Sequence, residues 1–350
     1  AADTLIHHAD TLIHEDKVAS NPSLVTTAAS LLAADQWLAE ASLVSLGAPV
    51  FALEHHASTT ADLVNLRSTA DRIGGQAPSD RNAWATGQSS RGDLTMEGLG
   101  KAPWQREGLN AGMAAPAETG SGHWGASIDQ STLQLDVHAD RARSKQLRLN
   151  GWLGRQGLAD GWLAILGIGR AETAIQRELK VGQSSSRLTS QRQDWSAQLR
   201  LEGNRQVAQD WQAYLAAGAI HQQMERLRER DADATGLGLE MASRKTTVSF
   251  IEPGLRWRRT GRHGKFGGQL SWTQALSGRQ TDLQARYTHI EGMPFTQPGS
   301  VIGRYRWRIG VDAERLVAGV TGGLIGSGEP ARRGGRPHVL GGGETTVELL

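Results

Sequence analysis

From residue 82 onward, the sequence repeatedly alternates apolar and polar residues with the two-residue period of a β-strand. In 146–153, Leu147, Leu149 and Leu153 share one face, while the other face is mostly polar. In 305–309, arginines occupy one face and Tyr305, Trp307 and Ile309 the other. A soluble core does not tolerate charge of this kind, whereas a polar lumen does. No helical pattern is interleaved to cover a parallel sheet, so we expect an antiparallel, meandering sheet.

About twelve segments show this extended pattern, and turns rich in Gly, Asp and Arg separate them. They are placed at 82–96, 104–115, 122–137, 145–156, 161–178, 190–203, 210–227, 238–258, 265–289, 300–317, 318–326 and 337–350. Two of the longer segments leave room for a further break. A membrane-spanning β-strand needs about 9 to 11 residues, so most of these segments are long enough to cross a bilayer.

Composition excludes several classes of protein. The chain has no cysteine, which excludes a disulfide scaffold, a thiol nucleophile and thiolate metal sites. Lys and Arg number 38 against 36 Asp and Glu, so no basic excess points to nucleic acid. The 43 glycines disfavour a helical bundle. The best apolar run, 163–168, is far shorter than the roughly 18 to 20 residues of a spanning helix. The first residues show no signal-peptide pattern.

The part before residue 82 reads as helical. ADTLIH occurs twice within 1–20, which we interpret as a tail or linker. A helix is expected over 25–46, opened by Asn21-Pro22 and ended by 47–49. A second helix is expected from about Ser58, a candidate cap, to Ile73, before two glycines. We therefore divide the chain into a tail or linker at 1–20, helical segments at 21–57 and 58–75, and a β-rich part at 76–350.

Several stretches, in this order, carry a family resemblance. They are RIGG at 72–75 followed by NAWA at 82–85, EGLNAG at 107–112, GWL at 151–153, DGWL at 160–163, GIGR at 167–170, IQR at 175–177, ERLRE at 225–229 with Gly236-Leu237, GLRW at 254–257 and MPF at 293–295. Over about residues 60 to 350, their order and spacing resemble the C-terminal translocator domain of classical autotransporters, a type V secretion barrel.

The resemblance implies an all-β fold: a 12-stranded antiparallel transmembrane β-barrel with an N-terminal α-helical segment threading the lumen. It implies a passenger-proximal segment at 21–57, a pore helix at 58–75 and an outer-membrane β-barrel translocator at 76–350. It implies an outer-membrane location in a Gram-negative bacterium and the export of an upstream passenger to the cell surface. The implied partners are outer-membrane lipid and lipopolysaccharide, the chain's own passenger, the barrel assembly machinery and periplasmic chaperones. Nucleic acid is not implied, and a monomer is expected.

The helix that would plug the lumen must be polar enough to face lumen charges. Its polar residues are Asp62, Asn65, Arg67, Ser68, Asp71 and Arg72. Tryptophan occurs about once per segment, a spacing typical of girdle residues at strand ends. These tryptophans are Trp84, Trp104, Trp124, Trp152, Trp162, Trp195, Trp257, Trp272 and Trp307.

Two features depart from the family. Family barrels usually finish on Phe or Trp, whereas this chain ends in Thr345-Thr346-Val347-Glu348-Leu349-Leu350. Only 4 Phe and 3 Tyr are present, few for an aromatic girdle. Some family members cut their passenger loose at an asparagine in the pore helix. Asn65, the only asparagine of the segment, stands alone and further from Arg72 than the family's pair, so self-cleavage is not expected.

The remaining motifs predict no chemistry. GMAAP at 112–116 lacks the serine of a subtilisin-type nucleophile, and GIGR at 167–170 lacks the later glycine of a dinucleotide fingerprint. Histidines at 7, 8, 14, 55 and 56 have poor chelating spacing. We therefore predict no catalytic, cofactor-binding or metal-binding residues, no cofactor and no enzyme activity.

Two alternatives stay open at this point. A soluble all-β binding or surface module would bury the Leu, Ile and Trp face and stay monodisperse in plain buffer. An outer-membrane barrel hydrolase would need a clustered Ser/His/Asp set or an acidic pair at the barrel mouth, and none can be placed on the sequence.

Overall fold

The structure is a computed structural model of the chain. It describes residues 45–73, 82–96, 100–117, 122–156, 160–181, 184–231, 237–261, 264–278, 282–288, 294–297, 305–317, 320–327 and 347–349, with a few separate positions before residue 45. Most of the tail predicted at 1–20 and of the helix predicted at 25–46 lies outside the described residues.

One long helix, α4 (Val50–Ile73), precedes the sheet. Residues 45–47 are also helical, and Ala48, with a φ of 46°, separates them from α4. Pro49 stands at the start of α4, where its missing N–H costs no hydrogen bond, and its carbonyl accepts the amide of Leu53 at 3.0 Å. The helix therefore begins at Val50 rather than at the candidate cap Ser58. It ends at Ile73, directly before Gly74-Gly75 as the sequence predicts.

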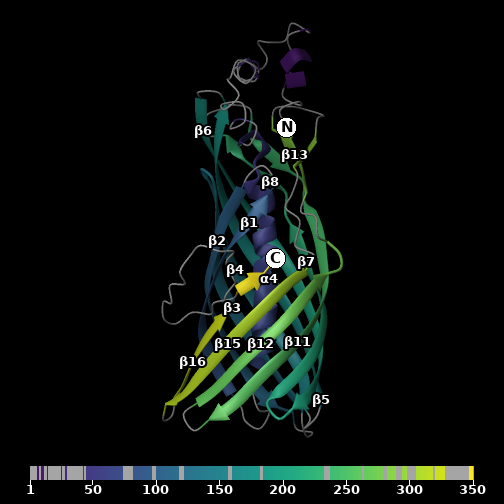
Figure 1. Cartoon of the computed structure of the whole chain (residues 1–350). Helices are drawn as coiled ribbons and strands as arrows, with labels where there is room; N and C mark the ends of the chain where they lie inside the picture. Colours follow the sequence, from purple (N-terminus) through teal and green to yellow (C-terminus); the bar gives the residue numbers. More distant parts are fainter. Residues whose placement is uncertain are drawn as a thin grey trace.

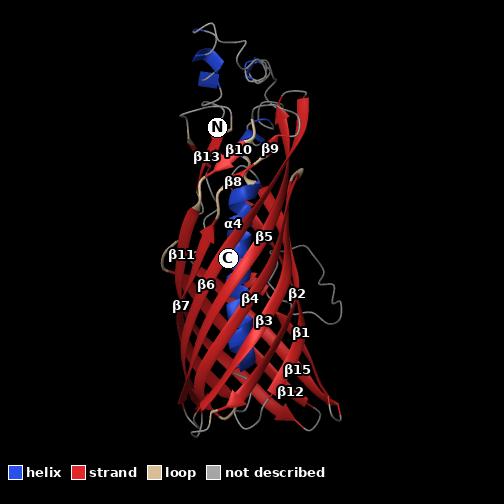
Figure 2. Ribbon diagram, turned by 180° about the vertical axis from the view of Figure 1, so that it is seen from behind, coloured by secondary structure: helices blue, strands red, loops and turns tan. Residues whose placement is uncertain are grey.

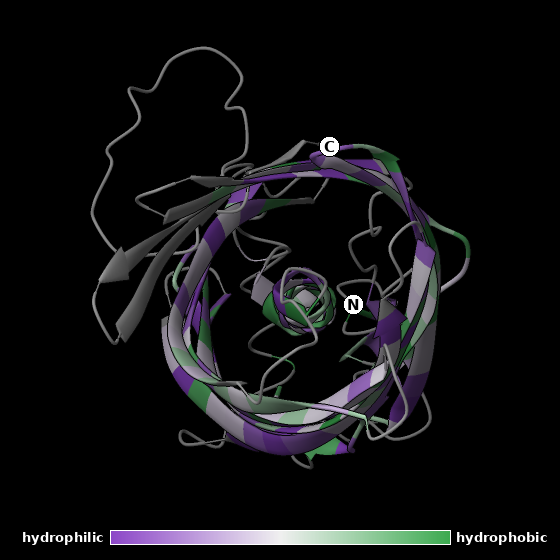
Figure 3. Ribbon diagram, turned by 90° about the horizontal axis from the view of Figure 1, so that it is seen from below, coloured by the Kyte–Doolittle hydropathy of each residue, from purple (hydrophilic) through white to green (hydrophobic). Residues whose placement is uncertain are grey.

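A single large antiparallel sheet curls around this helix (Figures 1 and 2). Its strands are β1 (Asn82–Met96), β2 (Gly100–Pro116), β3 (Gly122–Val137), β4 (Asp140–Gln156), β5 (Asp160–Val181), β6 (Ser184–Ala208), β7 (Trp211–Met224), β11 (Arg244–Gly261), β12 (Gly264–Ala275), β15 (Tyr305–Val317) and β16 (Val320–Ser327). Each pairs with the next in this order. Viewed along the axis, the sheet forms a ring with α4 at its centre (Figure 3). The predicted meander is confirmed.

Two short strands extend this sheet without lying on its main path. β17 (Val347–Leu349) pairs with β15 above the point where β16 ends, and β9 (Arg230–Asp231) pairs with β6. Trp307 is the register partner of Leu349, while Gly310 pairs with Ser327. β16 and β17 thus follow the same edge of β15. The predicted number of twelve barrel strands stays a prediction.

A small four-stranded sheet occupies the end of the barrel where α4 begins, which we call the upper end (Figure 1). Its order is β14 (Phe295–Gln297), β13 (Leu283–Tyr287), β10 (Leu239–Met241) and β8 (Leu227–Arg228). These strands come from the two longest connections, between β7 and β11 and between β12 and β15. Two of the longer predicted segments, 238–258 and 265–289, are each divided between a strand of the small sheet and a strand of the barrel.

The lower part of the barrel has apolar side chains on its outside. On β4, Leu147, Leu149 and Leu153 are exposed, and on β5 so are Leu166 and Ile168. The intervening residues face the lumen and are mostly polar or charged, as the burial alternation along β3 to β6 shows. Such a band of outward apolar residues around a polar interior is typical of an outer-membrane barrel.

Toward the upper end, the apolar face of the strands switches from outside to inside. On β3, the outward Trp124 and Ile128 give way to the inward Leu133, Leu135 and Val137. Even-numbered apolar positions thus become odd-numbered ones within a continuous strand, which moves them to the other face.

The same change of parity occurs on β5, from Leu166 and Ile168 outside to Ile175 and Leu179 inside. Most of the outward residues above the change are charged, including Arg170, Glu172 and Lys180. The upper wall therefore has the polarity of a water-soluble protein and extends beyond the apolar band.

The tryptophans divide between the two faces, so the predicted girdle is only partly right. Trp124, Trp162, Trp195 and Trp307 are exposed, and Trp211, which the prediction leaves out, joins them. Trp104 and Trp152 are buried inside. Trp84 also faces the lumen: its ring centroid lies 5.5 Å from that of Trp152, and its Nε1 donates to Asn110 at 3.1 Å. Even spacing along the chain does not reveal the face, because the face depends on residue parity within each strand.

Candidate functional site: the plugged lumen

Helix α4 is enclosed on every side by the barrel wall. Of its 24 residues, all but Asp71 and Arg72 are buried, including charged and hydroxyl-bearing ones. A buried polar group is costly unless it finds a partner, so the wall must supply partners around the whole helix.

Each carboxylate of α4 binds arginine on the wall. Glu54 pairs with Arg192 of β6. Asp62 accepts from Arg148 Nε of β4 at 2.5 Å and from Gln222 Nε2 of β7 at 2.8 Å. These three wall residues come from three different strands, so the helix is tied to several sides of the ring.

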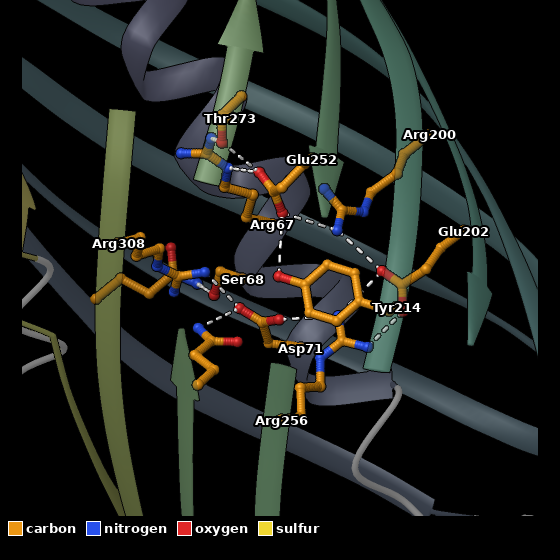
Figure 4. Close-up of polar contacts among 12 residues, drawn as sticks. Arg67, Ser68, Asp71, Arg200, Glu202, Tyr214, Glu252, Arg256, Thr273 and Arg308 are labelled. Atoms are coloured by element: carbon orange, nitrogen blue, oxygen red, sulfur yellow. Dashed lines mark hydrogen bonds and ion pairs between the residues drawn. The ribbon is translucent and has the colours of Figure 1, made fainter. Parts of the chain in front are cut away.

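Asp71, at the lower end of the helix, is held by two arginines and a glutamine. Arg308 of β15 donates to its carboxylate at 2.6 Å, Arg256 of β11 at 3.1 Å and Gln269 of β12 at 2.8 Å (Figure 4). Arg258 also donates to the backbone carbonyl of Asp71, at 2.8 Å. The lower end of α4 is its C-terminal end, which carries the negative end of the helix dipole. The dipole therefore also stabilises these nearby cations.

Arg67 makes the opposite pairing, with a cation on the helix and an anion on the wall. Its Nε lies 2.5 Å from Glu252 Oε2 of β11, and it also donates to Thr273 of β12. Glu252 in turn accepts from Arg200 at 3.0 Å and from the Tyr214 hydroxyl at 3.3 Å (Figure 4). The helix is therefore part of a network that continues across the wall.

The wall part of this network joins neighbouring strands without help from the helix. Glu202 of β6 binds Arg200 at 2.9 Å and is held by both outer nitrogens of Arg256. The Arg256 guanidinium also lies 4.0 Å from the ring centroid of Tyr214. Charges buried this deeply are expensive to leave unpaired, so removal of one partner destabilises the rest.

Neutral side chains of α4 find wall partners too. Ser68 accepts from Gln88 at 3.2 Å, and Asn65 accepts from Asn150 at 3.3 Å. Thr59 donates to Gln222 at 2.5 Å. All of these wall groups lie on the lumen face, so the hydroxyl and amide residues of the helix match a polar interior.

The upper part of the lumen is apolar instead. Phe51 and Leu53 of α4 lie in one buried cluster with upper wall residues such as Leu135 and Ile175. The small sheet contributes Leu239, Met241, Leu283, Tyr287 and Phe295 to the same cluster. The rings of Tyr287 and Phe295 are 5.3 Å apart. An apolar core thus closes the upper mouth around the start of the helix.

An ion pair fastens this closure to the wall. Arg177 of β5 binds Glu229 in the β7–β11 connection through two contacts, the longer at 2.8 Å. Arg177 also donates to the carbonyl of Ser45 at 2.8 Å, which ties the turn before α4 to the same group. Burial raises the pKa of the nearby Asp140 to about 6, although it accepts the backbone amide of Glu178.

The lumen residues predicted from the sequence are brought together as expected. Asp62, Arg67 and Asp71 bind wall charges, Asn65 and Ser68 accept hydrogen bonds, and the Arg72 guanidinium lies 5.8 Å from the ring centroid of Trp84. Glu54 is missing from the prediction because the predicted helix begins at Ser58. Continuing the helix back to Pro49 would have included it.

The adjacent histidines of α4 contact polar side chains of the wall. His55 Nε2 lies 3.3 Å from Thr246 Oγ1, and His56 Nε2 lies 3.4 Å from Arg306. Among the described residues, no group of three His, Asp or Glu side chains has the geometry to hold a metal ion. In the same residues, no helix is long and apolar enough to cross a membrane.

Comparison with known proteins agrees with this architecture. The family model "Autotransporter beta-domain" matches residues 83–323. The translocator domain of the autotransporter NalP from Neisseria meningitidis superposes with a TM-score of 0.65 at 14% identity, covering 80% of this chain and 94% of that one. The fold of the two is therefore similar.

Two further solved structures align less closely. The beta domain of the Bordetella autotransporter BrkA has a TM-score of 0.46 at 16% identity, with 68% of this chain and 86% of that chain covered. The Ralstonia pickettii toluene transporter TbuX has a TM-score of 0.46 at 11% identity, with 70% and 76% covered. A comparison with curated protein sequences finds no significant match. On the family match over residues 83–323, the chain belongs to the autotransporter beta-domain family and is a translocator domain.

Proposed function

We propose that this barrel lies in the outer membrane of a Gram-negative bacterium, supports the export of a passenger linked upstream, and is then closed by α4. The observation that carries the proposal is the fit of α4, whose three carboxylates each bind arginine on the wall. A helix about 10 Å in diameter largely fills a barrel of this size. It leaves little room for solutes to pass.

The orientation follows from the connections. The two longest, between β7 and β11 and between β12 and β15, lie at the upper end with the start of α4. Outer-membrane barrels have longer loops outside the cell and short turns in the periplasm. A passenger joined before α4 would therefore emerge on the cell surface.

The band of outward apolar residues would contact lipid. Just above it, cations such as Arg170 of β5 and Lys145 of β4 face outward. They are suited to the phosphates of lipopolysaccharide, which lie at this level of the outer leaflet. Insertion would use the barrel assembly machinery and periplasmic chaperones, and the barrel would act as a monomer.

Heat-modifiability on a gel tests the barrel itself. After refolding into detergent, a closed barrel resists SDS at room temperature and migrates faster than the boiled chain. We expect this shift together with a strand-rich circular dichroism spectrum. A chain that stays monodisperse without detergent and shows no shift would contradict the membrane location.

Single-channel recording tests the plug. Deletion of residues 50–73 should raise the conductance in planar bilayers, because the helix and its side chains leave the lumen. The heat shift of the same protein serves as the folding control. Unchanged conductance in a barrel that still shows the shift would contradict a plugging role for α4.

A further inference from the structure

We propose that the open pore is anion-selective, because arginines outnumber carboxylates among the charged side chains of the wall that α4 covers. The inference rests on the proposed function, since the pore conducts only when the helix is displaced. The ions concerned are small anions such as chloride and inorganic phosphate. In the closed state, the carboxylates of α4 occupy the positions where these anions would pass.

The described wall residues facing α4 within the lumen carry more positive than negative charge. Seven buried arginines line it: Arg106, Arg148, Arg192, Arg200, Arg256, Arg306 and Arg308. Three carboxylates are equally buried: Asp129, Glu202 and Glu252. Asp194, slightly more exposed, adds a fourth. The described wall is therefore positive by about three charges when the helix is absent.

The helix places carboxylates against these arginines at three levels. Glu54, Asp62 and Asp71 bind Arg192, Arg148 and the Arg256–Arg308 pair respectively. At about 1.5 Å rise per residue, these levels are about 12 and 14 Å apart along the axis. Withdrawal of α4 leaves the arginine at each level with one carboxylate fewer, and an anion crossing the pore meets one such level after another.

Arginine makes this selectivity independent of pH. The guanidinium keeps its proton throughout the accessible pH range. Rings of Arg or Lys are the means by which anion pores attract their ions and repel cations. Low-dielectric barrel walls focus the field of such charges into the lumen.

The test uses the full chain in planar bilayers under a salt gradient of KCl. The triple variant Glu54→Gln/Asp62→Asn/Asp71→Asn weakens the hold on the helix and should increase the frequency of openings. The reversal potential of those openings should give a chloride-to-potassium permeability ratio several-fold above one. The heat shift on a gel confirms that each variant is folded.

Wall variants identify the source of the selectivity. Arg148→Gln/Arg192→Gln, made in the triple-variant background, should lower the permeability ratio toward one. If that variant fails to fold, Arg306→Gln/Arg308→Gln in the same background provides the test and should likewise lower the permeability ratio toward one. Arg143→Gln/Lys145→Gln is the matched control, because both residues point outward from β4 and should leave the ratio unchanged.

The possible outcomes separate the two proposals. A ratio at or below one, or a ratio that the wall variants do not alter, would overturn anion selectivity while leaving the plug intact. Openings no more frequent in the triple variant than in the unmodified chain would count against the plug, while their ratio would still test selectivity. A folded triple variant that never conducts would contradict both.

Discussion

Arg148 joins the helix to the wall: its Nε lies 2.5 Å from Asp62 of α4, and its Nη1 lies 3.1 Å from Asp129 of β3. Asp129 is also bound by Arg106 of β2 at 2.8 Å. Within the lumen, side chains of alternating charge thus link α4 to β4, β4 to β3, and β3 to β2. The helix is one member of a buried network rather than a loose occupant of the pore.

Substitution of Asp62 should loosen the plug. Asp62→Asn leaves Arg148 with one carboxylate where it had two, and breaking a buried ion pair costs about 3 to 5 kcal/mol when one partner is removed. We expect openings in planar bilayers to become at least about tenfold more frequent. Glu172→Gln is the control, because Glu172 pairs with Arg170 on the exposed outer surface at 3.1 Å. Equal opening frequencies in the two variants would contradict this role for Asp62.

Truncation of Phe51 should destabilise the upper closure. Phe51→Ala removes a fully buried ring from the apolar cluster of the upper mouth and should cost about 3 to 5 kcal/mol. The measurement is the urea dependence of the gel shift, together with hydrogen exchange of the α4 amides. Leu166→Ala, on the outer face with 62% of its surface exposed, provides the comparison. If Leu166→Ala lost more stability than Phe51→Ala, the apolar cluster around Phe51 would not be what stabilises the upper closure.

The level at which the membrane ends can be tested along one strand. Ile168 and Ala174 both face outward on β5, and Ile168 lies in the apolar band whereas Ala174 lies above the change of face. An arginine facing lipid costs about 2 to 4 kcal/mol near the bilayer midplane and far less near the interface. We therefore expect Ile168→Arg to lower the free energy of unfolding in lipid vesicles much more than Ala174→Arg. Similar losses would show that the apolar band extends further up.

The stability of the upper wall should depend on pH through Asp140. Its pKa of about 6 in the folded chain is above the ordinary value, so the folded state binds the proton more tightly than the unfolded state. Stability is then greatest below about pH 4 and falls as the pH rises to 6, by about 2 kcal/mol. Asp140→Asn should abolish this dependence.

Urea midpoints in detergent at pH 4.5 and 7 measure this effect. Arg177, Glu178 and Glu229 surround Asp140 and are present in both proteins, so the difference between the two isolates Asp140. A midpoint that rises with pH in the unmodified chain, but not in Asp140→Asn, would contradict a destabilising effect of the ionised carboxylate.

The sequence itself contains the change of apolar face along the strands. The prediction from the alternating pattern assigns one apolar face to each strand and therefore does not include this change. Ile128 and Leu133 differ in parity within β3, as do Ile168 and Ile175 within β5. A single pattern predicts one apolar face throughout each strand. Because side chains on a strand alternate with a period of two, the switch of parity is sufficient to predict an apolar core above the membrane.

The ion-pair partners of the charged lumen residues cannot be predicted from the sequence. Asp62 and Arg148 are 86 positions apart, and Arg67 and Glu252 are 185 apart. Nothing local indicates that these pairs meet, because the angular position of α4 and the strand register are set by packing around the whole ring.

The sequence by itself determined the strands, their order and the polar character of the helix. These depend on local periodicity and on short turns that pair each strand with the next. The tertiary structure decided which arginine meets which carboxylate, where α4 begins, and that two connections fold into a sheet over the upper mouth. Those features depend on contacts between distant residues, and such contacts exist only once the sheet has curled around the helix.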